Sequence, residues 1–263
     1  MKSDAQIEFM KKIHRRKIII NLLRVGLLLL FLAAWEISAR MEIIDDFIFS
    51  SPSLLIKCAV EMFKSGVLQK HLFSTLRVTV ISFVLVTLLS LSVSLILWMS
   101  KSISCILEPY LVVLNSLPKS ALAPLLIVWL GNNQTTIIVA GVSVAIFGGI
   151  MTLYTSFNEV DPEKVKLIYT LGGNRYNVLT KLLLPGSVPV IISNMKVNIG
   201  LCLIGIVIGE MISSKEGLGY LIIYGTQVFK LDWVILSIII LCLIAFVFYI
   251  LMTGLEKAIR KRY

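Results

Sequence analysis

Apolar runs long enough to cross a membrane occupy most of this chain. Hydrophobic residues make up 57% of its 263 residues, and the mean hydropathy of +0.92 is far above the range of soluble globular domains. A helix needs about 20 apolar residues to cross a hydrocarbon core of roughly 30 Å. The sequence therefore predicts an all-α polytopic membrane protein, because a helix satisfies its own backbone hydrogen bonds inside lipid.

Six segments have the length and composition of transmembrane helices. They lie at about 18–39, 75–99, 104–130, 135–157, 188–212 and 233–255. The chain has neither an internal repeat nor a low-complexity linker. We therefore expect a single transmembrane domain at 18–263, with its core at 70–256, after a basic segment at 1–17.

Two connections between these segments are long. In the first, Ser51-Pro52 is a helix start and Gly66 a helix stop, and the residues between them are amphipathic. This helix is predicted to lie against the membrane or the bundle. The second connection, at 213–232, is predicted to be an outer segment.

Basic residues gather at both ends of the chain. Those before the first apolar segment are Lys2, Lys11, Lys12, Arg15, Arg16 and Lys17, and those after the last are Lys257, Arg260, Lys261 and Arg262. Because Lys and Arg are enriched on the cytoplasmic side, both termini are predicted to be cytoplasmic, which requires an even number of spans. The net charge of +10 could also indicate nucleic-acid binding, but no soluble basic fold accompanies it, so no nucleic acid is expected as a partner.

The sequence lacks the residue clusters that an enzyme needs. Its four cysteines are scattered without metal or disulfide spacing, and it has two histidines. It contains no G-x-x-x-x-G-K-[ST] phosphate-binding loop, and no Ser/His pair, carboxylate pair or His/Cys cluster at catalytic spacing. We therefore expect a chain that is not an enzyme and binds no cofactor or metal, so its energy comes from a partner or an ion gradient.

The third apolar segment is interrupted near its middle. It contains Pro109, Pro118 and Pro124, with Lys119 directly after the second proline. Proline removes a backbone donor and clashes with the preceding turn, so this helix is predicted to be kinked or broken. Broken backbone is tolerated at membrane depth where protein or water surrounds it, so this element is expected to line a water-filled route.

A charged segment at 158–186 separates the fourth and fifth apolar segments on the predicted cytoplasmic side. Asp161 is a favourable N-cap, and Pro162 fits the first helical position. Gly172-Gly173 can adopt positive φ, which ends this first helix and turns the chain. The segment is either a docking element for a soluble partner or an amphipathic loop that rests on the lipid headgroups.

A second short helix is predicted after the two glycines. Asn174 can cap its start, and Pro185 is expected to end it just before the chain re-enters the membrane. Pro189 then fits the first turn of the fifth span.

Several motifs follow the order and spacing of one known family. In the charged segment, Gly172, Leu182 and Leu184-Pro185 resemble the conserved cytoplasmic EAA loop of ATP-binding-cassette (ABC) importer permeases. Further segments are similar to the nitrate/sulfonate/taurine branch of that family. They are 49–53, 116–118, 123–131, 208–211 and 217–222.

The resemblance implies a type I ABC importer (MetI-like) permease fold in the lipid bilayer of the plasma (inner) membrane. Such a permease subunit pairs with a second copy, with two ATPase subunits that use ATP and Mg²⁺, and with an extracytoplasmic solute-binding protein. Its substrate would be a small solute such as a sulfonate, nitrate or a vitamin precursor. The alternative is a secondary active transporter driven by an ion gradient, although such carriers usually have more spans and internal repeats.

The coupling helix of the family, which docks on the ATPase, falls on the first helix of the charged segment. The residues implied in this contact are Lys166, Leu167, Ile168, Tyr169, Leu171, Gly172 and Gly173, and those implied in the loop structure are Asp161, Pro162 and Pro185. Lys166-Leu167-Ile168 stands where the family has Glu-Ala-Ala. A base thus replaces an acid, and two large apolar residues replace two small ones. These changes predict an ATPase groove of matching shape and complementary charge.

Three charged residues are candidates for the translocation path, namely Lys119, Lys196 and Glu210. A charge inside the membrane is costly unless it faces water or a partner. Lys119 either attracts an anionic solute or pairs with a carboxylate such as Glu108 or Glu210. Lys196 and Glu210 share the fifth span and are expected to be structural partners or gate elements.

Overall fold

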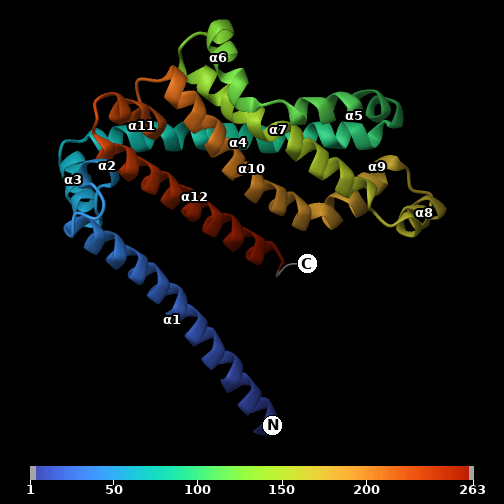
Figure 1. Cartoon of the computed structure of the whole chain (residues 1–263). Helices are drawn as coiled ribbons and strands as arrows, with labels where there is room; N and C mark the ends of the chain where they lie inside the picture. The colour runs from blue at the N-terminus through green and yellow to red at the C-terminus, as the bar shows by residue number, and fades with distance from the viewer. Residues whose placement is uncertain (1–3, 261–263) are drawn as a thin grey trace.

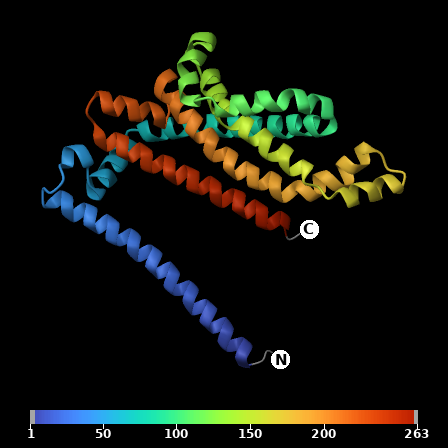
Figure 2. The same cartoon turned by 45° about the vertical axis from the view of Figure 1, so that its right-hand side comes forward.

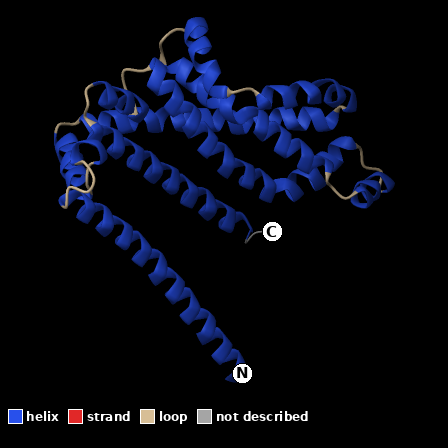
Figure 3. Ribbon diagram, viewed as in Figure 1, coloured by secondary structure: helices blue, strands red, loops and turns tan. Residues whose placement is uncertain are grey.

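The computed structural model describes residues 4–260, which form helices joined by short connections, with no strand among them (Figure 3). The elements in chain order are α1 (Asp4–Arg40), α2 (Asp46–Phe49), α3 (Pro52–Lys64), α4 (Val67–Met99), α5 (Lys101–Ser116), α6 (Lys119–Leu130), α7 (Gln134–Asn158), α8 (Pro162–Thr170), α9 (Arg175–Val178), the π-helix η1 (Leu179–Leu183), α10 (Leu184–Ser213), α11 (Leu218–Gln227) and α12 (Leu231–Arg260). The all-α prediction is confirmed. Of the basic terminal residues, Lys2, Lys261 and Arg262 lie outside the described residues, as do the side chains of Lys11, Lys17 and Arg260.

Five helical segments are long and apolar enough to cross a membrane. They are Ile18–Arg40, Val67–Met99, Gln134–Asn158, Arg175–Ser213 and Leu231–Ile259. The pair formed by α5 and α6 is a sixth candidate, but it bends by 105°. The predictions of about six spans and of a broken third segment are therefore confirmed. The break lies at Pro118, whereas Pro109 and Pro124 lie inside α5 and α6.

α4, α7 and α10 pack against one another and form the centre of the bundle (Figures 1 and 2). Glycines allow their close approach. A Cβ on Gly205 would lie 2.8 Å from the Ala140 carbonyl oxygen, and a Cβ on Gly141 would lie 2.8 Å from Cγ1 of Ile206. Such contacts through small residues stabilise helix pairs in lipid, where apolar burial between helices contributes little.

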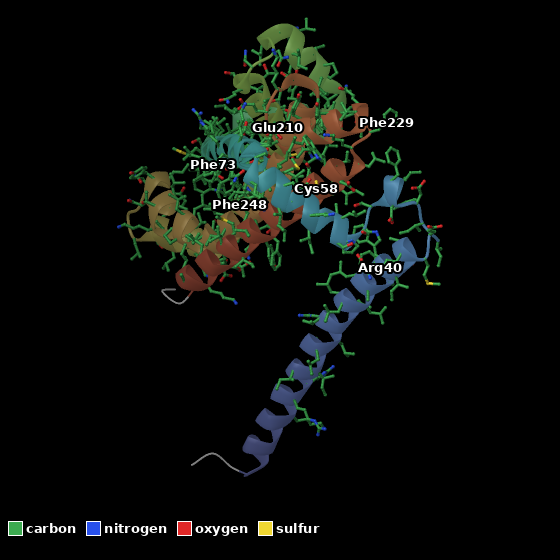
Figure 4. The ribbon with its side chains drawn as sticks, turned by 90° about the vertical axis from the view of Figure 1, so that its left-hand side faces the viewer. Arg40, Cys58, Phe73, Glu210, Phe229 and Phe248 are labelled. Atoms are coloured by element: carbon green, nitrogen blue, oxygen red, sulfur yellow. The ribbon has the colours of Figure 1, made fainter. Side chains whose placement is uncertain are left out.

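α3, α11 and α12 form a second packed cluster at one end of the bundle. Its buried residues are Leu55, Cys58, Met62, Leu68, Leu203, Leu218, Leu221, Leu236 and Ile244. α3 is the predicted amphipathic helix, since Ser51 Oγ accepts from the Leu54 N–H at 3.4 Å and Gly66 with φ +78 follows its end. Burial raises the pKa of the Cys58 thiol to about 11, and its position on α3 is labelled in Figure 4. Cys58 is therefore an apolar filler, and α3 packs on the bundle.

α1 diverges from the bundle over most of its length (Figures 1 and 2). It meets the bundle near its C-terminal end, where Trp35 Nε1 donates to the Ser50 carbonyl at 3.1 Å and Glu36 Oε2 accepts from the Ser53 N–H at 3.1 Å. α1 is unbroken from Asp4 to Arg40, so the described part of the predicted basic segment, 4–17, continues into the first span as one helix.

Two boundaries differ from the prediction. α4 begins at Val67, before the predicted start of the second span, so part of the connection is helical. The outer segment at 213–232 contains the unpredicted helix α11, in which Leu218 and Leu221 are buried. Its apolar residues are positioned by contacts with distant helices, which a local pattern does not report.

Candidate functional site

The charged segment between α7 and α10 begins with a short helix that projects from one end of the bundle (Figure 1). Asp161 caps this helix, α8, since its Oδ1 accepts from the Glu163 N–H at 2.9 Å, and Pro162 occupies the first turn. None of the residues of α8 is buried. Local bonds therefore determine where α8 starts, in the position that the sequence predicts.

Gly172 and Gly173 end α8 for two different reasons. The Gly172 N–H donates to the Tyr169 carbonyl at 3.0 Å, and the Gly173 N–H donates to the Ile168 carbonyl at 2.9 Å. This pair of bonds closes the left-handed turn common at helix C-termini, with Gly172 at φ +79. Gly173 does not have positive φ, but a Cβ there would lie 2.5 Å from Cγ2 of Ile168. Conformation therefore requires glycine at 172, and close packing requires it at 173.

The residues implied in docking do not all face outward. The exposed ones are Lys166, Leu167, Tyr169, Leu171 and Gly172. Ile168 and Gly173 are half-buried and lie against each other. Ile168 therefore contributes to the packing of the loop itself, while Leu171, at 78% exposure, is the most prominent apolar side chain.

The second helix of the segment does not end at Pro185, which corrects the prediction. Asn174 caps this helix as expected, with Oδ1 accepting from a backbone N–H at 2.9 Å. α9, η1 and α10 then follow one another without a break. In η1 the Leu184 N–H bonds to the Leu179 carbonyl, and this wider turn accommodates Pro185, which has no N–H. Pro185 lies in the first turn of α10, and Pro189 lies inside it.

α9 and η1 are seated against the ends of two core helices. Leu179 and Leu183 of η1 are buried against Leu153 and Phe157 of α7. Trp98, near the end of α4, packs on the same cluster. The charged segment thus combines an exposed helix with a continuation that is anchored in the bundle.

Lys119 lies at the break between α5 and α6. Its Nζ donates to the Asn115 carbonyl oxygen at 2.6 Å and to Oδ1 of the same residue at 3.4 Å. No ion pair joins it to Glu108 or Glu210 within residues 4–260. Lys119 bonds to Asn115 because the carbonyl oxygens in the last turn of α5 have no partner within the helix and lie next to it in the chain.

Lys196 and Glu210 are not partners of each other. Lys196 forms an ion pair with Glu256 of α12, and its Nζ lies 5.8 Å from the centre of the Tyr249 ring. An opposite charge and an aromatic face both stabilise an ammonium group away from water. Lys196 therefore ties α10 to α12.

Glu210 is fully buried inside the bundle (Figure 4). Its carboxylate accepts from Thr75 Oγ1 at 2.8 and 3.0 Å and from the Gly219 N–H at 2.9 Å. Thr75 Oγ1 in turn accepts from the Leu218 N–H at 2.8 Å. A Cβ on Gly217, whose φ is +111, would overlap the Glu210 carboxylate. Glu210 and Thr75 therefore fix the start of α11 to α10 and α4.

Sequence reasoning missed two members of this network, Thr75 and His71. His71 Nδ1 accepts from the Gly217 N–H at 3.0 Å, and its ring stacks on Tyr220 with centroids 5.6 Å apart. Thr75 and His71 have no distinctive spacing along α4, so no local pattern singles them out. The sequence did contain one indication of this network, since the segments around Glu210 and Gly217 both resemble the same family.

The three candidate path residues are held separately, since no hydrogen bond or ion pair in the described chain joins any two of them. A polar cleft of about 420 Å³ lies close to the Glu210 network, at the end of the bundle away from α8. The cleft is lined by Ser74, Asn132, Asn133, Gln134, Ile137, Ser213, Ser214, Lys215 and Glu216.

The chain is similar to several known proteins in sequence and in fold. A probable ABC transporter permease protein of Haemophilus influenzae is 30% identical over 229 residues, which cover 87% of this chain and 91% of that protein. The taurine transport system permease protein TauC of Escherichia coli is 24% identical over 241 residues, covering 89% of this chain and 87% of that protein. In an inward-facing crystal structure of the MetNI methionine ABC transporter, one chain aligns with a TM-score of 0.65 at 14% identity, covering 74% of this chain and 97% of that one.

The structural likeness shows the fold, which is the MetI-like fold that the sequence motifs implied. Residues 87–263 match the family model described as the binding-protein-dependent transport system inner membrane component. This match includes the charged segment and every helix from α5 to α12. The chain therefore belongs to the family of inner-membrane permease subunits of binding-protein-dependent ABC importers, in its nitrate/sulfonate/taurine branch.

Proposed function

We propose that this permease subunit carries a small solute across the membrane and is driven through the segment 158–186, which docks α8 on a separate ABC ATPase. The observation that carries the proposal is α8 itself, a helix of nine residues that is bonded at both ends and buries none of them. A helix this short is not stable alone in water. The end bonds reduce the entropy that is lost when a partner groove receives it.

The exposed face of α8 defines the chemistry of the partner surface. Leu167, Tyr169 and Leu171 offer apolar area, and Lys166 adds a positive charge. The ATPase groove is therefore expected to be apolar at its floor and acidic at its rim. Ile168 and Gly173, which are half-buried and contact each other, hold α8 in place on its other side.

In the assembly that we infer, two copies of this chain lie side by side, each with one ATPase. A solute-binding protein delivers solute at the opposite face, and both termini lie in the cytoplasm with α8. ATP and Mg²⁺ are bound by the ATPases, and this chain binds no cofactor. Closure of the two ATPases would draw the α8 helices together and move the bundles between two openings.

The charged candidates have different roles in this proposal. Lys119, at the break in the third segment, lines the path. Lys196 and Glu210 hold α12 and α11 to α10, and so act as structural or gate elements.

Site-specific photo-crosslinking tests the docking. A photoreactive residue replaces Leu171, and the matched control replaces Phe229, which is 70% exposed at the far end of the bundle. We expect Leu171, but not Phe229, to capture a protein with a phosphate-binding loop. If Leu171 captures no such protein in membranes that actively transport solute, the docking proposal is refuted. A loop that rests on lipid headgroups would give this negative result.

A secondary carrier driven by an ion gradient is tested separately. The purified chain in liposomes should neither hydrolyse ATP nor take up solute under a proton or sodium gradient. The complex with its ATPase and binding protein should hydrolyse ATP in response to loaded binding protein. Gradient-driven uptake by the chain alone would favour the carrier.

We propose that the solute is a sulfonate, nitrate or a vitamin precursor. Support for the sulfonate comes from the similarity to TauC, whose name states taurine, an amino sulfonate. A thermal-shift screen of the cognate binding protein against these three classes tests the assignment. Stabilisation by a solute outside them would overturn it.

A further inference from the structure

The charged segment has one polar attachment to the rest of the bundle among the hydrogen bonds of residues 161–183. Arg175, the first residue of α9, donates from Nη2 to the Trp98 carbonyl oxygen at 2.6 Å. The other hydrogen bonds of this segment remain within it or join it to α10. The guanidinium carbon also lies 5.3 Å from the centre of the Trp98 ring. Arg175 therefore contacts both the backbone and the side chain of one residue of α4.

The position of Trp98 explains why an arginine suits this contact. The last four carbonyl groups of a helix have no partner within it and carry partial negative charge. In α4 the Ser100 N–H bonds to the carbonyls of Ile96 and Leu97. Arg175 supplies the donor for the next carbonyl along, and its positive charge complements this end of the helix dipole. The Trp98 ring adds a cation–π contact.

The contact sits where motion of α8 would enter the bundle. Ile168 of α8 lies against Gly173, and Gly173 is followed directly by Asn174, the cap of α9. α9 is continuous with α10 through η1. A displacement of α8 therefore reaches α10 along the continuous helix that starts at α9. It reaches the end of α4 through the polar contact of Arg175 and through the apolar cluster on which Trp98 packs.

We infer that Arg175 is a positioning residue for coupling, which ties the docking segment to the end of α4 so that α4 and α10 move together. This inference rests on the proposed function, because it names the residue through which the docked segment acts on the bundle. Without this tie, a pull on α8 would reach the end of α4 only through apolar packing, and the end of α4 would follow α10 less closely. ATP would then be hydrolysed with less solute moved.

The test compares solute transported per ATP hydrolysed in the complete complex with its ATPase and binding protein. Arg175→Gln removes the charge and the ring contact and weakens the bond to the Trp98 carbonyl, so this ratio should fall measurably. Trp98→Leu keeps the carbonyl and removes the ring, so its loss should be smaller. Because the ring acts through Arg175, the double variant should be no worse than Arg175→Gln alone.

Lys181→Gln is the matched control, since Lys181 is an exposed cation in η1 of the same segment. It should leave the ratio unchanged, and complex assembly and apparent Tm should be the same in Arg175→Gln and Lys181→Gln. Trp98→Leu also removes ring contacts with the cluster of Leu153 and Leu183, so a lower Tm is expected for that variant. An unchanged ratio in Arg175→Gln would overturn the inference. If Arg175→Gln does not assemble, Trp98→Leu decides the question, and an unchanged ratio in that variant would overturn the inference.

A second measurement needs no ATPase and separates this inference from the proposed function. Spin labels are placed at Met99 and Tyr176, which are exposed neighbours of Trp98 and Arg175. In the solubilised chain, Arg175→Gln should broaden the distance distribution between the labels, and Lys181→Gln should not. Identical distributions would overturn the tie even if the ATPase docks as proposed. If no ATPase docks while Arg175→Gln broadens the distribution, the proposed function fails and the tie stands.

Discussion

The two ends of α10 are joined to their neighbouring helices in different ways. At the Glu210 end, a buried carboxylate, the Thr75 hydroxyl and two backbone N–H groups of α11 satisfy one another. At the Leu184 end, α10 continues through η1 and α9 to α8, whose side chains lie outside the core. One end is closed by internal bonds, and the other presents a surface that has no partner within the described chain.

This difference indicates that one end of α10 contributes mainly to the stability of the fold, and the other mainly to the proposed contact with a partner. Removing one member of a buried polar network lowers the free energy of unfolding strongly, because the remaining polar groups lie in surroundings of low dielectric and cannot form hydrogen bonds with water instead. A substitution on an exposed helix changes the free energy of unfolding little, because water replaces each lost contact. Substitutions near Glu210 should therefore change the free energy of unfolding, and substitutions on α8 should change the response to a partner.

The largest effect is expected from Glu210→Ala. It leaves the Thr75 hydroxyl and the Gly219 N–H without their buried acceptor, and should lower the free energy of unfolding by about 2–4 kcal/mol. Thermal unfolding in detergent micelles measures this change. The control is Glu163→Ala, because Glu163 is exposed on α8. Equal losses in the two variants would contradict the comparison.

A paired glycine substitution sharpens the comparison. Gly217 and Gly172 both have positive φ, but a Cβ at 217 would overlap the Glu210 carboxylate, whereas a Cβ at 172 meets nothing within 4 Å. Each alanine carries backbone strain of about 1 kcal/mol, and Gly217→Ala adds a steric clash. Unfolding measurements should therefore show the greater loss for Gly217→Ala. A greater loss at Gly172 would break the distinction between the two ends.

Bulky replacements at Gly172 and Gly173 should affect coupling more than stability. Leucine at both positions strains the end of α8 and displaces Ile168, so the docking face moves while the spans remain intact. We expect membrane insertion at the normal level and a loss of ATP-driven transport. Gly186→Leu is the control, since a Cβ on Gly186 would meet nothing within 4 Å. Unaltered transport in the double variant would contradict the docking assignment.

The smallest change in stability is expected from Leu171→Ser. Leu171 is 78% exposed, so the free energy of unfolding should change by no more than about 0.5 kcal/mol. Copurification with the ATPase should nevertheless decrease, because apolar area in the proposed contact is lost. A large loss of stability would show that Leu171 packs within this chain.

Local signals predicted the exposed end of α10 better than the buried end. The cap at Asp161, the stop at Gly172 and the cap at Asn174 all depend on residues within three or four positions, and all were found. The prediction that the helix ends at Pro185 was wrong, because the wider π turn before it accommodates a proline, which has no N–H to donate. The helix α11 was missed, because contacts with α4, α10 and α12 hold it in place.

The amino-acid order by itself determined the membrane-spanning helices, the broken third segment and the capped helix α8, since hydrophobic length and capping act between near neighbours. The family match also followed from motifs along the chain. The tertiary structure alone decided which groups meet. Thr75 and Glu210 are 135 positions apart, and Trp98 and Arg175 are 77 apart. Such pairs form because helix packing brings them into hydrogen-bond distance, and no periodic or capping signal encodes that distance.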